Sequence, residues 1–454
     1  DDNDVSSNSD IDSLIFGKDN TQHIVAAEIV DEEIWLFKND GSIERRPHEY
    51  WVLSSRPVGK DCEILEGGLF YKYLKKFSTR ENYAKARGKM YQRNIPAYNI
   101  YDPVEAYMIM NGVTFFKGLK VNDVSVLSFD IETTGVTHDS NSSVLLISNT
   151  YRGTSGEIFR RLFTLEDYNN DAEMIADWCA WVYEVDPTML VGHNVLGFDL
   201  PYLAYCYDRE YPEGLPIGRD GSGITFSKRP TKIRKDGSQS YDIFNAKVFG
   251  RQIIDTWILS LTYDFGRNYD NYKLKYIVEY EGLEKKNRTF FDFGENLPKD
   301  IWKRYLEGDT EMWEKFKQYC IEDSDDSLNL YDLMIPQFFY YTQSLPMPFQ
   351  TMNMTATGRQ INGFLCRSYL QQGHSIPAPS EKEEYEGAIS FGNPGVYAHV
   401  YKVDVASLYP SIMITEEIYD EEKDPDGNFL KMVKHFTKER LANKLQAKIT
   451  GDRY

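Results

Sequence analysis

The pattern of apolar and polar positions divides the chain into regions of different character. The first dozen residues are acidic and polar, and we expect residues 1–23 to be a disordered lead-in. Short β-rich runs such as HIVAAEIV and EIWLFK occupy about Ile24 to Val52, with a turn at Asn39-Asp40-Gly41. A helical stretch is expected from about Leu69 to Tyr91. Together these features predict an N-terminal domain over residues 24–120.

From Val124 the pattern changes to alternating strands and helices. The run VSVLSFDIE is mostly apolar, as expected of a strand that is buried on both faces. Amphipathic helix patterns follow at Asp171–Glu184 and Pro298–Leu333, which predicts an α/β domain over residues 121–333. Residues 334–384 are mixed in character, and we expect them to join the N-terminal domain.

The C-terminal part again shows a strand pattern followed by a helix pattern. A strand pattern, VYKVDVA, begins near Val400, and a basic helix pattern begins near Leu430. The whole pattern predicts a multidomain protein of α/β and α+β class.

Composition supports packed domains and narrows the class of protein. The 454 residues exceed what one hydrophobic core normally serves, and hydrophobic residues make up 41% of them. No apolar run approaches the roughly 18 residues of a membrane span, so we expect a soluble protein. A net charge of −19 argues against nonspecific coating of nucleic acid, but it leaves room for an enzyme acting on DNA, because metal-dependent phosphoryl chemistry uses carboxylates. The five cysteines are scattered without a C-x-x-C pair, which favours reduced thiols.

Three segments with acidic residues stand out as candidate chemistry. Asp130 and Glu132 end a strand, and alternation places both side chains on one face, where they could bind Mg²⁺ or Mn²⁺. Asp199 follows an apolar run and opens a helix-like segment, so it is either a helix cap or part of a site. Tyr319 and Asp323 lie four residues apart and share a helix face, which by itself is also typical of a solvated acidic face.

The order of these segments resembles a known set of motifs. D-I-E, then N-x-x-x-F-D, then Y-x-x-x-D is the pattern of the DEDDy exonucleases, the 3′→5′ proofreading nucleases of replicative DNA polymerases. The resemblance implies that residues 121–333 have an RNase H-like fold and bind two divalent metal ions. The implied metal ligands are Asp130, Glu132, Asp199 and Asp323. Tyr319 would orient the attacking water, and we expect Asn194 and Phe198 of the second motif to contact DNA.

Two further segments lie between the second and third motifs. GRQIIDTWILSLTYDFGRNYDNYKLKYIVEYEGL resembles a family segment in which Asp255 is either an outer-shell group or a helix cap. The alternating run ITFSKRPTKIRKDGSQSYDIFNAKVFG, with a turn at Asp236-Gly237, predicts a β-hairpin. It resembles the hairpin with which T-even phage polymerases move a primer end, and a plain surface hairpin is the alternative.

VYKVDVASLYPSIM is the most specific segment of the chain. It matches D-x-x-S-L-Y-P-S, motif A of the family B DNA polymerases. The resemblance implies that Asp404 binds the metal ion of an incoming dNTP and that Tyr409 excludes a 2′-hydroxyl. The other nucleotide-binding residues expected are Val405, Ser407, Leu408, Arg440 and Lys444. For the last two, both on the basic helix, solvated helix charges are the alternative.

The segment YEGAISFGNPGVY precedes motif A and resembles the Y-x-G-(G/A) linker of the family. We expect Tyr385 and Gly387 to contact template DNA, although Ala388 replaces the second glycine of the pattern. On this resemblance, residues 385–429 begin a polymerase palm and residues 430–454 begin the fingers. The motifs K-x-x-x-N-S-x-Y-G and Y-G-D-T-D-S are not in the sequence. Nucleotide addition should therefore require a C-terminal portion or a second chain.

The sequence thus predicts the N-terminal portion of a family B replicative DNA polymerase of phage or bacterial type, with Mg²⁺ or Mn²⁺ at an exonuclease site and at a completed polymerase site. Expected partners are primer–template DNA, single-stranded 3′ ends, dNTPs, the C-terminal polymerase portion and a sliding clamp, in the cytoplasm of a bacterial or phage-infected cell. A stand-alone exonuclease and a non-catalytic DNA-binding scaffold are the rival hypotheses.

Overall fold

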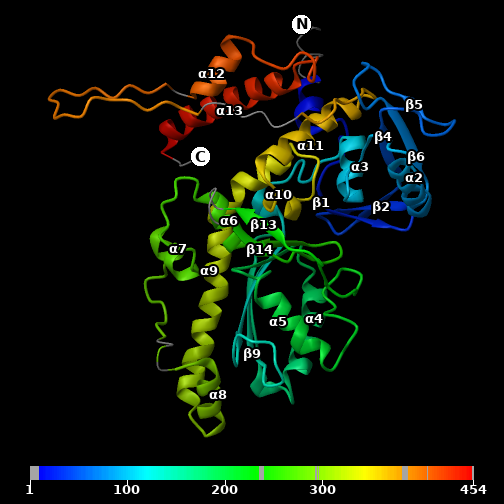
Figure 1. Cartoon of the computed structure of the whole chain (residues 1–454). Helices are drawn as coiled ribbons and strands as arrows, with labels where there is room; N and C mark the ends of the chain where they lie inside the picture. Colours follow the sequence, from blue (N-terminus) through cyan, green and yellow to red (C-terminus); the bar gives the residue numbers. More distant parts are fainter. Residues whose placement is uncertain are drawn as a thin grey trace. The chain divides into compact units, whose positions relative to one another are not determined.

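The computed structural model describes residues 10–234, 240–291, 294, 296–380, 387–405 and 407–451 (Figure 1). The chain forms two compact units, each assembled from separate stretches. One unit contains residues 1–19, 49–113 and 361–454, and the other contains residues 20–48 and 114–360. The mixed α/β, multidomain fold class predicted from the sequence is confirmed. Among the described residues, no helix combines the length and apolar character needed to cross a bilayer.

The unit of residues 20–48 and 114–360 is built on a five-stranded mixed sheet. Its strands, in spatial order, are β10 (Ile158–Thr164), β9 (Val144–Arg152), β8 (Val126–Thr133), β11 (Met189–Gly192) and β16 (Gln252–Asp255). Neighbouring strands are antiparallel from β10 to β8 and parallel from β8 to β16. The carboxyl ends of β8, β11 and β16 therefore meet at one edge of the sheet. The loop that leads to Asp199 follows β11 at this edge, and Asp255 is the last residue of β16.

Helices cover both faces of this sheet. Helices α4 (Asp171–Val185) and α5 (Asp199–Asp208) pack on one face in a large core that includes Phe129 and Trp178. Helix α9 (Thr310–Thr342) packs on the other, where the Ser128 hydroxyl donates a 2.8 Å hydrogen bond to the Ser324 carbonyl. Alternation along β8 therefore sends Phe129 into the apolar core and its neighbours toward α9.

The same unit holds further short elements. A three-stranded antiparallel sheet comprises β1 (Ile24–Val30), β2 (Glu33–Lys38) and β3 (Ile43–Pro47). The predicted hairpin is present, since β13 (Thr231–Arg234) pairs antiparallel with β14 (Ser240–Ile243); its turn at Asp236-Gly237 lies outside the described residues. The remaining elements are β12 (Thr225–Phe226), β15 (Ala246–Lys247), α6 (Thr256–Tyr263), α7 (Leu274–Tyr280), α8 (Pro298–Leu306) and α10 (Phe349–Asn353).

The second unit combines a small sheet with helices. Strands β5 (Glu63–Ile64), β6 (Tyr73–Phe77), β4 (Tyr50–Ser54) and β7 (Ala97–Tyr98) pair in that order. Its helices are α2 (Arg80–Gln92), α3 (Pro103–Asn111), most of α11 (Thr357–Leu370), α12 (Leu408–Thr415) and α13 (Asn428–Thr450). The expectation of a disordered lead-in is wrong for residues 10–16, which are helical because Leu14 and Ile15 pack into the interior and are buried.

Three sequence-based assignments of elements were wrong in part. The helix expected from Leu69 begins only at Arg80, because Tyr73–Phe77 pairs with β4 and β5 instead. The helix pattern over Pro298–Leu333 is interrupted at Gly308, whose φ of 107° ends α8. Residues 400–405 form no strand, since no described segment pairs with them and a strand needs a hydrogen-bonded neighbour.

The turn at Asn39-Asp40-Gly41 joins β2 to β3, and Gly41 has the positive φ of 83° that such a turn requires. The predicted helices near Asp171 and Leu430 correspond to α4 and α13. All five cysteines are free thiols, and four of them are buried, at positions Cys179, Cys206, Cys320 and Cys366.

Candidate functional site

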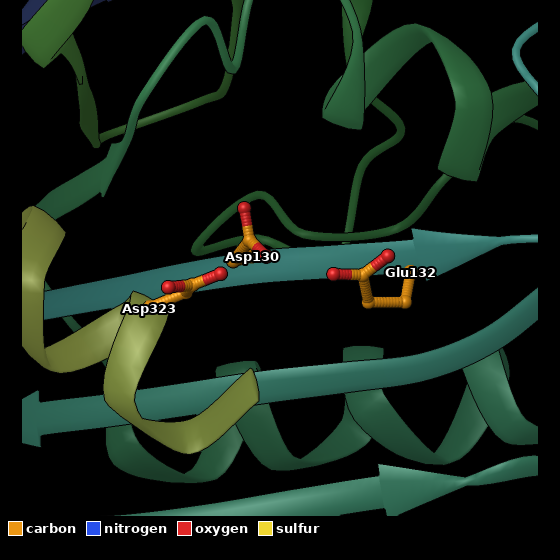
Figure 2. A group of neighbouring side chains, drawn as sticks. All are labelled: Asp130, Glu132 and Asp323. Atoms are coloured by element: carbon orange, nitrogen blue, oxygen red, sulfur yellow. The ribbon is translucent and has the colours of Figure 1, made fainter. Parts of the chain in front are cut away.

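Three carboxylates gather where β8 faces helix α9. The side chains of Asp130 and Glu132 project from the same side of β8, and Asp323 projects from α9 toward them (Figure 2). One carboxylate oxygen from each residue lies within 4.8 Å of the others. Period-2 spacing on the strand and a helix packed across it are sufficient to produce this convergence.

The environment of the cluster disfavours negative charge. Burial and the charges of Asp199, Asp323 and Glu132 raise the pKa of Asp130 well above its ordinary value. Burial and the charge of Asp323 raise the pKa of Glu132 to about 8. Burial also raises the pKa of Asp323, against the opposing effect of two nearby cations, Lys275 and Arg288. Carboxylates crowded in this way are stabilised by added positive charge.

Hard oxygen donors at this spacing fit a divalent cation such as Mg²⁺ or Mn²⁺. The donor set contains only carboxylate oxygens, without the cysteine or histidine ligands typical of zinc. The identity of the metal ion stays a prediction.

Asp199 lies near these groups but makes a different contact. It is the first residue of α5, it is buried, and its Oδ1 accepts a hydrogen bond of 3.2 Å from the Ile131 backbone N–H. Burial raises its pKa to about 7. Asp199 is outside the group of three oxygens within 4.8 Å, so the structure brings together three of the four predicted ligands that closely.

The loop before Asp199 is held by Asp255, the N-cap residue of α6. Its Oδ1 accepts hydrogen bonds from the backbone N–H groups of Asn194 (2.9 Å) and Trp257 (2.9 Å), and its Oδ2 accepts one from Leu196 (3.1 Å). The helix-cap alternative is therefore the one observed. Asn194 itself has a left-handed φ of 68° and an exposed side chain.

Tyr319 lies one turn before Asp323 on α9 and is buried. The ring of Phe291 packs near it, with 5.9 Å between centroids. The Nζ atom of Lys275 lies 3.7 Å from the Tyr319 ring centroid and 3.6 Å from Asp323 Oδ2. Arg288 donates a hydrogen bond to Asp323 Oδ1. Both cations were missed in the sequence, because no spacing rule connects them to α9.

The predicted nucleotide-binding residues lie in the other unit. Asp404 is exposed, as are the side chains of Val405, Leu408 and Tyr409. Ser407 begins α12 with a left-handed φ of 54°, and its hydroxyl accepts a hydrogen bond from Arg440. Lys444 and Gly387 are exposed, and Tyr385 lies outside the described residues. Among the described residues, Asp404 belongs to no group of converging carboxylates.

Comparison with known proteins defines the class of domain that holds the carboxylates. A family model described as the exonuclease domain of family B DNA polymerases matches residues 104–277. This range includes β8 with Asp130 and Glu132, and the first residue of α5, Asp199.

Full-length relatives and a solved structure extend the likeness. A DNA polymerase of Archaeoglobus fulgidus is 25% identical over 300 residues, which cover 62% of this chain and 35% of that protein. The DNA polymerase delta catalytic subunit of Drosophila melanogaster is 26% identical over 66% of this chain and 29% of its own length. The family B DNA polymerase of Pyrobaculum calidifontis matches with a TM-score of 0.66 and 20% identity, over 93% of this chain and 63% of that one.

Residues 104–277 of the chain thus match the exonuclease domain of the family B DNA polymerases, and the relatives named above are DNA polymerases. The chain spans about a third of the length of the curated relatives named above. The matched relatives are archaeal and eukaryotic, so the phage or bacterial type stays a prediction.

Proposed function

We propose that this chain is the N-terminal part of a replicative DNA polymerase and that it removes nucleotides from 3′ ends as a proofreading exonuclease. The observation that carries the proposal is the convergence of Asp130, Glu132 and Asp323. The first two of these residues lie in the segment that matches the exonuclease domain of family B DNA polymerases. Carboxylates whose negative charges repel one another in a partly buried site are costly unless a cation joins them.

The residues of the site have two proposed roles, metal binding and orientation of the attacking water. Asp130, Glu132, Asp199 and Asp323 would hold two Mg²⁺ or Mn²⁺ ions, which when bound supply an activated water and stabilise the leaving oxygen of an in-line displacement. For Asp199, support comes from its charge, which acts on Asp130. Tyr319 would orient the water with its hydroxyl.

The loop of residues 194–198 is the proposed DNA contact. Asn194 is exposed, and Phe198 is half-buried and precedes the ligand Asp199 directly. Because Asp255 fixes the backbone of this loop, the exposed side chains need little further ordering to meet a DNA strand. Template contacts by Tyr385 and Gly387 remain part of the proposal on motif resemblance alone.

The motif A segment is proposed as half of a dNTP site. Asp404 would hold the metal ion that accompanies the triphosphate, Tyr409 would exclude a ribose 2′-hydroxyl, and Val405, Ser407 and Leu408 would line the phosphates. The side-chain contact between Arg440 and Ser407 supports placing the basic helix α13 beside this segment. Arg440 and Lys444 would then meet the triphosphate.

The exposure of this segment supports the need for a further portion of polymerase. Tyr409 is 76% exposed and Val405 is 56% exposed, which is unusual for apolar residues around a working site. A C-terminal portion or second chain would cover them and supply the remaining carboxylate. Synthesis by this chain alone is therefore not expected.

A nuclease assay tests the proposal. The purified chain, with Mg²⁺ or Mn²⁺, should shorten a 5′-labelled single-stranded oligonucleotide from its 3′ end, and Asp130→Asn should reduce the rate by at least about 10²-fold. The control is Asp300→Asn, since Asp300 is an exposed residue of the first turn of α8. An equal rate in the wild-type and Asp130→Asn proteins would refute the proposed site.

A further inference from the structure

The segment that contains α7 and the residues after it is bound to α9 by a series of polar contacts. Lys285 pairs with Asp325, and Arg288 pairs with both Asp323 and Asp326. The backbone N–H of residue 289 donates a 2.7 Å hydrogen bond to the Glu322 carboxylate. Four acidic residues within residues 322–326 of α9 are thus contacted by this one segment, and Asp325 also pairs with Arg160 of β10.

Lys275, on α7, differs from the other cations because it contacts two proposed site residues. Its Nζ lies 3.6 Å from Asp323 Oδ2 and 3.7 Å from the centroid of the Tyr319 ring. A cation at that distance from an aromatic ring is attracted by its electron-rich face. The charge of Lys275 also counteracts the rise in pKa of Asp130 and Glu132, so its field extends over the whole cluster.

Both oxygens of Asp323 are engaged by cations, Oδ1 by Arg288 and Oδ2 by Lys275. A divalent ion that binds Asp323 therefore shares this carboxylate with two positive charges that repel it. Arg288 is only 14% exposed and is also held by Asp326, whereas the Lys275 side chain is 46% exposed. The ion pair of Lys275 is longer than a close contact, and a flexible ammonium is easily reoriented. Lys275 is accordingly the cation that can move away from Asp323 more easily when a divalent ion binds.

We propose that Lys275 is a positioning residue of the carboxylate site: it balances Asp323 in the metal-free protein, competes with a divalent cation for that carboxylate, and remains over the Tyr319 ring when the cation binds. The inference rests on the proposed exonuclease function. It assigns to Lys275 two opposed effects, weaker metal binding and better placement of Tyr319. A residue with a purely structural role would not produce both.

Calorimetric titration of the full chain with Mn²⁺ distinguishes these effects from a general loss of folding. Removing one positive charge next to the bound ion should tighten Mn²⁺ binding in Lys275→Met by on the order of tenfold. Lys275→Arg keeps the charge and the cation–π contact and should bind Mn²⁺ like the wild type. Lys273→Met is the matched control, since Lys273 is an exposed lysine two residues away.

Nuclease kinetics supply the second readout. In Lys275→Met the Mn²⁺ concentration for half-maximal rate should fall while kcat also falls, by several fold, because Tyr319 loses its cation. Unchanged or weaker Mn²⁺ binding in a Lys275→Met protein with wild-type thermal melting overturns the inference while leaving the exonuclease proposal intact. If Lys275→Met does not fold, Lys275→Gln is tested against the same criterion. Absence of any Mn²⁺ binding by the wild type overturns both proposals.

Discussion

Asp255 offers a sharp test of how the site is built, because one carboxylate anchors three backbone N–H groups. Replacing it with alanine leaves the amides of Asn194, Leu196 and Trp257 without their acceptor. A buried donor without a partner costs about 1–3 kcal/mol, and water that enters the vacated space recovers part of that. We therefore expect Asp255→Ala to lower the local stability of the loop by about 3–5 kcal/mol.

Hydrogen–deuterium exchange followed by mass spectrometry measures this loss directly. Because every 1.4 kcal/mol is a factor of ten, amides 194 and 196 should exchange roughly 100 to 4,000 times faster in Asp255→Ala. Asp255→Asn retains one acceptor oxygen and should show a smaller effect. The nuclease rate should also decrease in Asp255→Ala, because the destabilised loop directly precedes the proposed metal ligand Asp199.

The control removes a helix cap that accepts fewer backbone hydrogen bonds than Asp255 does. Asp309 caps α9 by accepting one backbone hydrogen bond, of 3.3 Å, from the Met312 N–H, and its other oxygen pairs with the exposed Arg304. Because an exposed ion pair adds little, Asp309→Ala should cost only about 1 kcal/mol. Exchange at amides 194 and 196 that stays within about threefold of the wild type in Asp255→Ala would show that this carboxylate does not hold the loop.

Three further predictions concern other parts of the chain. Chelation of divalent ions should lower the thermal midpoint of the wild type, and re-addition of Mn²⁺ should restore it in the wild type but much less in Asp130→Asn. Burial lowers the pKa of His48 to about 4, so between about pH 6.5 and 4 the unfolded chain binds a proton that the folded chain does not. The free energy of unfolding should therefore decrease as the pH is lowered from about 6.5 to about 4, and it should decrease less steeply in His48→Phe. Urea unfolding at several pH values measures this difference. Arg367 is fully buried and donates hydrogen bonds to the carbonyls of Leu14 and Ile15, so Arg367→Met should make the N-terminal residues accessible to limited proteolysis.

The sequence predicted elements best where periodicity and capping agree. Helix α4 was predicted from its apolar spacing, and in the structure its start is also fixed by Asn170, whose side chain accepts a hydrogen bond from the Glu173 N–H. The strand carrying Asp130 and Glu132 was predictable for a similar reason, since an apolar run ends in alternating carboxylates. In both cases the local signal and the tertiary environment favour the same structure.

Tertiary contacts decided the elements that were missed. Nothing in YLKKF excludes a helix, and only pairing with β4 makes it a strand. The strand pattern near Val400 is local, but its backbone finds no partner among the described residues. The positions of Lys275 and Arg288 beside Asp323 depend on how the chain after α6 folds back onto α9, which no spacing in the sequence encodes.

The alternation of the chain between its two units has a consequence for synthesis on the ribosome. The chain passes from one unit to the other after residues 19, 48, 113 and 360. All residues of the unit with the carboxylate cluster have been made once position 360 has been translated, so that unit can fold early. The other unit requires segments from both ends of the chain, and residues 49–113 must wait for residues from 361 onward. A nascent polypeptide of this protein therefore completes the unit with the carboxylate cluster first, while residues 49–113 are still without their final packing partners.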